Sequence, residues 1–264
     1  MASPWSVLGR SVRGTAHARL GLRCQDSWGV GHLPGGGLVV AVADGAGSAA
    51  RSDEGSAVAV RAAVDHVLAA LANPMVESDP AAVGAGAVLA AREAVLDLAR
   101  AESGDAEDAG RDYAATLALA LALPAGLWTA LRGDCAVVAR AADGALFPAG
   151  VPRNGEYANQ TFFLTDPWEE PFVVGACHPP ADALAVLSDG LLPVSVRLAD
   201  WTPHPGFFAP LFAFAVGGAS DAPQRLGRFL ASEKINARTD DDKTVVLAVR
   251  AAVTGGAHAE VLTP

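Results

Sequence analysis

The sequence has few cysteines and few basic residues. Three cysteines among 264 residues are too few for a disulfide framework, and there is no Cys-x-x-Cys pair for a structural zinc ion. Lys and Arg number 19 against 29 Asp and Glu, which gives a net charge of −10. Nucleic acid and anionic lipid both require a basic surface, so we expect neither as a partner. The scarcity of cysteine favours a reduced, cytoplasmic location.

Long apolar runs are also absent. No stretch approaches the roughly eighteen residues of a membrane span, and the first residues show no basic region followed by an apolar core, so we expect no signal peptide. Apolar residues nevertheless make up 51% of the chain, which is enough for a sizeable core. Since no linker or internal repeat divides the sequence, we expect one domain over residues 1–264 and a monomer.

Hydrophobic period and turn residues predict a chain that mixes helices and strands. The run 117–123 alternates Leu with Ala, and its period of two favours a strand although both residues favour helices. Asp79 and Pro80 provide an N-cap and a first-turn proline for a helix. The predicted strands are 38–43, 117–123, 127–132, 136–140, 144–147, 161–164, 183–187 and 244–250, and the predicted helices are 53–71, 80–101, 207–216 and 223–234. Residues 151–180 are expected to be irregular around their short strand, and residues 251–264 to form a loose tail.

A minority of the acidic residues lie at the ends of apolar strands. Asp44 and Asp189 each follow such a strand, Asp134 lies between two, and Asp241 precedes the last. Several carboxylates that converge would repel one another unless cations lay between them. Oxygen ligands suit Mg²⁺ or Mn²⁺ and do not suit thiolate-seeking metals. A single Asp-Gly pair is usually only a turn, so the set and its order carry the argument.

The ordered set resembles the metal-dependent serine/threonine protein phosphatases of the 2C type, in a divergent bacterial branch. Five motifs stand in the family's order: Gln25-Asp26, Asp44-Gly45-Ala46-Gly47, Gly133-Asp134-Cys135, Ser188-Asp189-Gly190 and Asp241-Asp242-Lys243-Thr244. The resemblance implies an α+β fold, a four-layer α/β/β/α sandwich of two antiparallel sheets flanked by helices. It also implies a flap-like insertion beside the site at about 151–180.

The resemblance implies roles for these residues. The catalytic metal ligands would be Asp26, Asp44, Asp189 and Asp241, with the carbonyl of Gly45 and with Asp134 as further ligands. Two Mn²⁺ or Mg²⁺ ions would hold a bridging hydroxide that attacks the phosphorus of a phosphoserine or phosphothreonine. The expected partners are a phosphorylated protein substrate and a cognate Ser/Thr kinase.

Two departures from the family pattern concern substrate handling. The histidine that many relatives carry after Asp-Gly is Ala46 here, and the phosphate-binding arginine falls at Gly21. On an extended strand Arg19 and Arg23 would share the face of Gly21, and His17 has the same parity, so all three are candidates for binding phosphate. The simpler interpretation is that these side chains are solvated.

A third departure is Pro193, which stands where the family has the second ligand of a weaker third metal, so a well-formed third site is not expected. The leading hypothesis is an active metal-dependent protein phosphatase. One alternative is a pseudo-phosphatase, a binding module for a phosphoprotein or a kinase. The other is a hydrolase of small phosphoesters, because only the rim of the site would differ.

Overall fold

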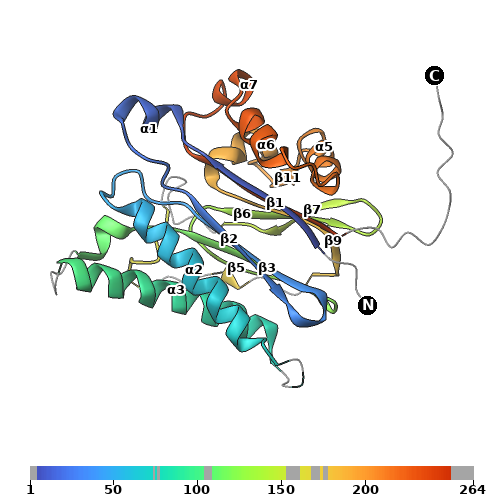
Figure 1. Ribbon diagram of the computed structural model, residues 1–264, viewed down its shortest axis with the longest axis horizontal. Helices are drawn as coiled ribbons and strands as arrows, with labels where there is room; N and C mark the ends of the chain where they lie inside the picture. The colour runs from blue at the N-terminus through green and yellow to red at the C-terminus, as the bar shows by residue number, and fades with distance from the viewer. Residues whose placement is uncertain are drawn as a thin grey trace.

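The computed structural model describes residues 5–73, 75, 78–103, 109–152, 161–167, 173–174 and 178–250. Two antiparallel sheets pack face to face and helices cover their outer faces (Figure 1). The four-layer α/β/β/α arrangement predicted from the sequence is confirmed. No helix in the described part of the chain combines the length and the apolar character that a membrane crossing requires.

Each sheet has five strands among the described residues. The first sheet has the order β2 (Ser27–Leu33), β3 (Gly37–Ala43), β4 (Leu117–Leu123), β5 (Gly126–Arg132) and β8 (Val173–Val174). The second has the order β1 (Trp5–Val12), β12 (Lys243–Arg250), β9 (Ala181–Leu187), β6 (Ala136–Ala141) and β7 (Leu146–Gly150). A separate hairpin pairs β10 (Val196–Arg197) with β11 (Thr202–Pro203).

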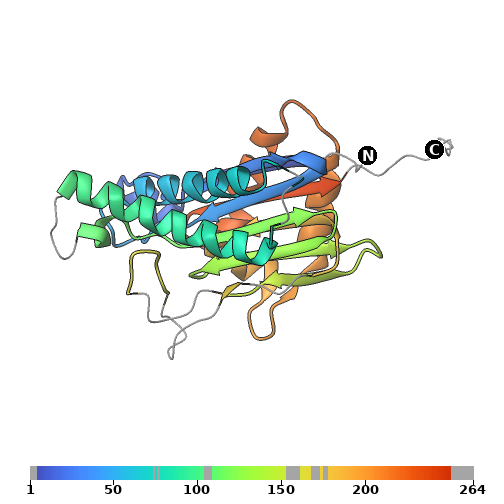
Figure 2. The ribbon, with the colours of Figure 1, turned by 90° about the horizontal axis from the view of Figure 1, so that it is seen from below.

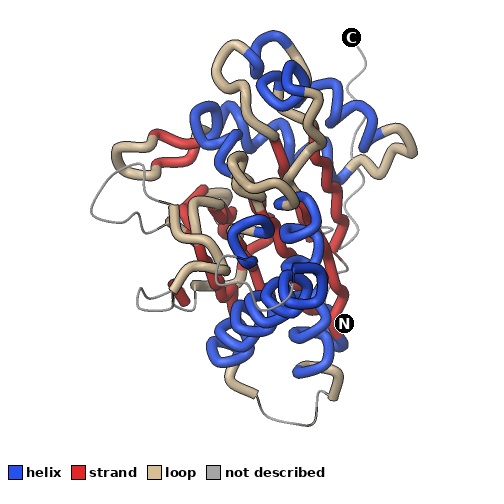
Figure 3. The backbone as a smooth tube through the Cα atoms, turned by 90° about the vertical axis from the view of Figure 1, so that its left-hand side faces the viewer, coloured by secondary structure: helices blue, strands red, loops and turns tan. Residues whose placement is uncertain are grey.

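The helices lie on two opposite sides of the sandwich (Figure 3). On the first sheet lie α2 (Ser52–Ala70) and α3 (Pro80–Ser103), side by side (Figure 2). On the second sheet α5 (Pro205–Val216) and α6 (Ala222–Leu230) pack against β12 and β1. The short helices are α1 (Thr15–Leu20), α4 (Leu192–Ser195) and α7 (Glu233–Asn236), with 3₁₀ turns η1 (Pro34–Gly36), η2 (Ala109–Tyr113) and η3 (Asp189–Leu191).

The alternation in β4 reflects burial on both faces of the first sheet. Leu117, Leu119 and Leu121 pack beneath α2 and α3, whereas Ala118 and Ala120 face the other sheet. All five side chains are fully buried. Large side chains therefore fill the wider space under the helices, and small ones let the two sheets approach. The period of two predicted this strand correctly against helix propensity.

Several local predictions are wrong. Residues 161–164 form a loop instead of a strand, although the Leu164 N–H donates to the Ala115 carbonyl at 2.8 Å. The predicted helix 223–234 divides into α6 and α7, and the strand predicted at 144–147 is shifted to Leu146–Gly150. The segment around Gly21 is not extended, because it follows α1 and Gly21 itself has a left-handed φ of 71°.

The remaining predictions are mixed. The helix N-terminus at Asp79 is confirmed, because the Asp79 carboxylate accepts a hydrogen bond from the Ala81 N–H at 3.0 Å. The strands β1 and β2 were not predicted. Most of the proposed flap 151–180 lies outside the described residues, and so does the whole tail 251–264. The flap, the tail and the single-domain boundary stay predictions.

Candidate metal centre

A cavity of about 300 Å³ opens at the strand ends where four of the predicted aspartates meet. Asp44 follows β3, Asp189 follows β9, Asp134 lies between β5 and β6, and Asp241 immediately precedes the β12 region. Gly45 also lines this cavity. Segments that are far apart in the sequence thus bring the predicted carboxylates to one end of the sandwich.

The carboxylates of this cluster are crowded and poorly solvated. Carboxylate oxygens of Asp44, Asp134 and Asp189 all lie within 4.8 Å of one another. Burial raises the pKa of Asp189 to about 6, and burial with the nearby charges of Asp26 and Asp189 raises the pKa of Asp44 well above its ordinary value. Burial likewise raises the pKa of Asp134. In the absence of a cation the cluster resists full ionisation.

Asp26 lies behind this cluster. Its carboxylate accepts a hydrogen bond from the Ser188 hydroxyl at 2.7 Å, and the Ser188 oxygen accepts one from the Thr244 N–H at 2.9 Å. Burial raises the Asp26 pKa to about 7. Asp26 lines a neighbouring cavity of about 470 Å³ beside β2 and α2. Its charge is nevertheless close enough to raise the pKa of Asp44.

Two threonines that the sequence analysis did not single out orient the cluster. The Thr116 oxygen accepts a hydrogen bond from the Asp44 N–H at 3.0 Å, and the Thr116 N–H donates to the Asp44 carbonyl at 2.8 Å. The Thr161 hydroxyl donates to the Asp134 carboxylate at 2.5 Å. Both threonines also line the cavity. The only sequence signal was that Thr116 directly precedes the strand at 117–123.

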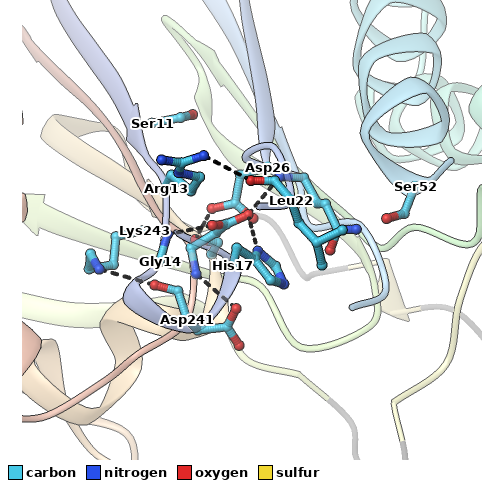
Figure 4. A network of polar contacts seen from close by, with 12 residues as sticks. Ser11, Arg13, Gly14, His17, Leu22, Asp26, Ser52, Asp241 and Lys243 are labelled. Carbon is cyan, nitrogen blue, oxygen red and sulfur yellow. Dashed lines mark hydrogen bonds and ion pairs between the residues drawn. The ribbon is translucent and has the colours of Figure 1, made fainter. Parts of the chain in front are cut away.

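Asp242 is a second residue whose importance the sequence analysis missed. Its carboxylate accepts hydrogen bonds from the N–H groups of Gly14 and Gln25, each at 2.6 Å, and lies 2.9 Å from His17 Nδ1. The Asp242 side chain is almost fully buried. Figure 4 shows Gly14, His17, Asp26 and Asp241 within this polar network. The hydrogen bonds to Asp242 therefore hold the segment 14–25 against the start of β12. Its position in the last motif was the available signal.

Glycine is required where these segments touch. A Cβ on Gly190 would overlap the main-chain oxygen of Asp242, so glycine after Asp189 lets η3 lie against the start of β12. A Cβ on Gly45 would lie 2.7 Å from the Ser52 carbonyl oxygen. The Asp-Gly pairs are therefore contact points between segments as well as turns.

The three candidates for phosphate binding occupy different places. His17 is buried and lines the cavity with the aspartates. Arg19 is exposed, and its guanidinium is 3.0 Å from the Asp240 carboxylate at the cavity rim. Arg23 is exposed, lies 3.5 Å from Asp53 and lines another cavity. The shared face expected for an extended strand does not exist, because α1 and the turn at Gly21 separate these side chains.

The donor set of the cavity fits a hard divalent cation. Its ligands are carboxylate oxygens, and a buried oxygen of each of Asp26, Asp134 and Asp189 has no hydrogen-bond partner among the described residues. Such oxygens are costly to bury unless a cation or water satisfies them. An aspartate cluster at the end of a two-sheet sandwich is the arrangement expected of a metal-dependent phosphatase.

Comparison with known proteins identifies the family. Residues 13–231 match the family described as Protein phosphatase 2C. Over 262 residues the chain is 33% identical to Serine/threonine-protein phosphatase 3 of Escherichia coli (strain K12), covering 93% of this chain and 98% of that protein. The chain belongs to the protein phosphatase 2C family. The predicted family, enzyme class and dependence on Mn²⁺ or Mg²⁺ are thereby confirmed.

Solved structures agree on the fold. The serine/threonine phosphatase Stp1 from Staphylococcus aureus aligns with a TM-score of 0.61 at 14% identity, covering 96% of this chain and 97% of that one. The S. agalactiae serine/threonine phosphatase aligns with a TM-score of 0.60 at 14% identity, covering 94% and 100% of the two chains. Both confirm the two-sheet architecture.

Proposed function

We propose that this chain removes phosphate from phosphoserine and phosphothreonine in proteins, in a reaction that depends on two divalent cations, Mn²⁺ or Mg²⁺. The observation that carries the proposal is the cluster of Asp44, Asp134 and Asp189, whose oxygens lie within 4.8 Å of one another. Family membership and the 33% identical E. coli phosphatase support it.

Three of the four predicted catalytic aspartates line the cavity of about 300 Å³, and the fourth, Asp26, lies behind it. Asp44, Asp189 and Asp241 would hold the cations from the cavity side, together with the carbonyl of Gly45, and Asp26 from the buried side. Bound divalent cations at such a site neutralise phosphate oxygens and lower the pKa of a coordinated water. Asp134 adds a further carboxylate, held by Thr161. The hydrogen bonds from Ser188 and Thr161 fix carboxylates that would otherwise repel one another.

His17 is the best placed of the three candidates for phosphate binding. Asp242 lies 2.9 Å from its Nδ1, which leaves Nε2 as the ring nitrogen available to a ligand. Nε2 lies 3.6 Å from the position that a Cβ on Gly47 would occupy, and both residues line the cavity. An N–H at Nε2 can donate to a phosphate oxygen. Arg19 at the rim and Arg23, which lines a separate cavity, stay predictions.

One assay tests the proposed function. Hydrolysis of para-nitrophenyl phosphate and of a phosphothreonine peptide is measured with Mn²⁺, with EDTA and for Asp189→Asn. Asp143→Asn, the same change at an exposed site in the turn between β6 and β7, is the control. We expect turnover of both substrates that requires Mn²⁺ and is lost only in Asp189→Asn. No turnover above that variant would favour a binding module, and turnover of the small ester alone would favour a hydrolase of small phosphoesters.

The wider setting rests on the sequence. We propose a phosphorylated protein as substrate and a cognate Ser/Thr kinase as the enzyme that produces it. A monomer in the cytoplasm, without nucleic acid or membrane as partner, stays the prediction drawn from composition and charge.

A further inference from the structure

A groove of about 580 Å³ lies on the helical side of the second sheet, away from α2 and α3. It is formed by α5, α6, α7 and the turn that contains α4; α5, α6 and α7 lie at the top of Figure 1. Phe207, Phe229 and Ile235 provide its apolar surface. His204, Lys234 and Arg238 provide its polar edge. We call this feature the basic groove.

The charge of the basic groove is opposite to that of the protein. None of its lining residues is acidic. Over residues 204–238 four Lys and Arg face two Asp and Glu, a net charge of +2, whereas the whole chain carries −10. Among the described residues neither Lys234 nor Arg238 forms an ion pair, and both are exposed. Lys234, one of the two lysines of the chain, is therefore available to bind an external anion.

The apolar part of the basic groove contains an exposed aromatic ring. Phe229 is 37% exposed, and its ring centroid lies 6.2 Å from that of the buried Phe207. Aromatic side chains in partly open pockets are the usual anchor points of protein interfaces. The groove thus offers an apolar anchor flanked by positive charge.

Two stretches of chain connect the basic groove to the metal centre. Pro193, in the groove, is four residues after Asp189, and Arg238 is three residues before Asp241. Consecutive Cα atoms are about 3.8 Å apart, so the Cα atoms of Arg238 and Asp241 are within about 11 Å. An extended peptide advances about 3.3 Å per residue. A substrate with its phosphoresidue at the centre can reach the groove within roughly three to six residues.

We propose that the basic groove binds an acidic segment with an apolar anchor residue, located a few residues from the phosphoresidue of the protein substrate. The proposal rests on the proposed function and adds a substrate class to it. Charge complementarity selects this occupant, because an acidic segment is repelled by most of a surface with a net charge of −10 and attracted at the groove.

The test compares two phosphothreonine peptides of equal length, one with Asp, Glu and Leu beside the phosphoresidue and one with Gln and Ser in their place. Lys234→Glu and Arg238→Glu reverse the charge of the groove, and Phe229→Ser removes the anchor. Arg10→Glu makes the same charge change at an exposed position on β1 and is the control. The kcat and KM of each variant are measured on both peptides and on para-nitrophenyl phosphate.

The wild type should prefer the acidic peptide. Lys234→Glu and Arg238→Glu should each raise the KM for that peptide about fivefold, the scale of an exposed charge pair. Phe229→Ser should raise it as well, and all three variants should leave the neutral peptide and the small ester unchanged. The proposal is overturned if the wild type shows no preference, if the loss extends to the small ester, or if Arg10→Glu has the same effect. Failure of the proposed function is distinguishable, because the wild type would then hydrolyse neither phosphothreonine peptide.

Binding provides a readout that does not depend on turnover. A fluorescent, unphosphorylated form of the acidic peptide is titrated with wild type and Lys234→Glu in EDTA, and its anisotropy is recorded. Weaker binding by the variant supports the proposal. Equal binding by both proteins, or binding of anionic vesicles in place of the peptide, overturns it.

Discussion

Replacing Asp26 with Asn should stabilise the metal-free protein at pH 8. Burial raises the Asp26 pKa from its ordinary value of 3.8 to about 7, so the folded protein keeps this proton to a higher pH than the unfolded chain does. The free energy of unfolding therefore falls as the pH rises from about 4 to 7. A shift of roughly three units corresponds to about 4 kcal/mol at 1.36 kcal/mol per unit.

The Asn variant is not subject to this loss, because its side chain does not ionise and its oxygen can still accept the hydrogen bond from Ser188. In EDTA it should exceed the wild type by up to about 4 kcal/mol at pH 8 and by little below pH 4. With Mn²⁺ the advantage of the Asn variant at pH 8 should shrink. A cation at about 100 times its dissociation constant adds about 2.7 kcal/mol to the protein that binds it, and Asn is the weaker ligand.

The assay is urea denaturation at pH 4 and pH 8, each with EDTA or Mn²⁺, on wild type and Asp26→Asn. Asp143→Asn removes the same charge from the exposed turn between β6 and β7 and should change the free energy of unfolding little at either pH. The reasoning is refuted if Asp26→Asn in EDTA at pH 8 is no more stable than the wild type. It is also refuted if Mn²⁺ stabilises both proteins equally.

Further substitutions test individual contacts. Asp189→Asn should lower metal-dependent turnover more than about hundredfold, beyond the loss for an outer-shell partner, and should abolish the rise in melting temperature with Mn²⁺. His17→Ala should raise the KM for para-nitrophenyl phosphate about tenfold without changing that rise; an unchanged KM would remove His17 from the site. Gly190→Ala should lower the free energy of unfolding by roughly 1–3 kcal/mol through overlap with the main chain. Gly84→Ala in α3, where a Cβ meets only an ordinary contact at 3.6 Å, should raise it by about 0.5–1 kcal/mol, as denaturation will show.

The sequence predicted the elements that have a strong hydrophobic period. The alternation at 117–123 identified β4, and the capped run after Asp79 identified α3. By contrast the sequence analysis missed β1 and β2. Both are edge strands of their sheets, so only a few of their residues are buried and their hydrophobic pattern is weak. The loop at 161–164 resembles a strand in sequence, but only Leu164 is fully buried. A local sequence pattern does not predict secondary structure correctly where distant segments decide which residues are buried.

The order of the motifs predicted which residues are the metal ligands, but it did not predict which residues surround each ligand. Asp44, Asp134 and Asp189 were predicted from their places beside apolar strands, and the structure brings them within 4.8 Å of one another. Asp242 and His17 lie 225 positions apart, and no spacing rule pairs them. The prediction for Arg19 and Arg23 assumed an extended strand, which the left-handed turn at Gly21 replaces.

By itself the sequence determined the chemical character of this protein, because strand ends, carboxylates and the order of motifs are local properties of the chain. Only the tertiary structure decided which carboxylates ionise with difficulty, since the pKa of Asp26 depends on burial by segments from both sheets. It also placed His17 in the cavity and assembled the basic groove from four helices. Charge, burial and contact between distant residues arise only when the chain has packed.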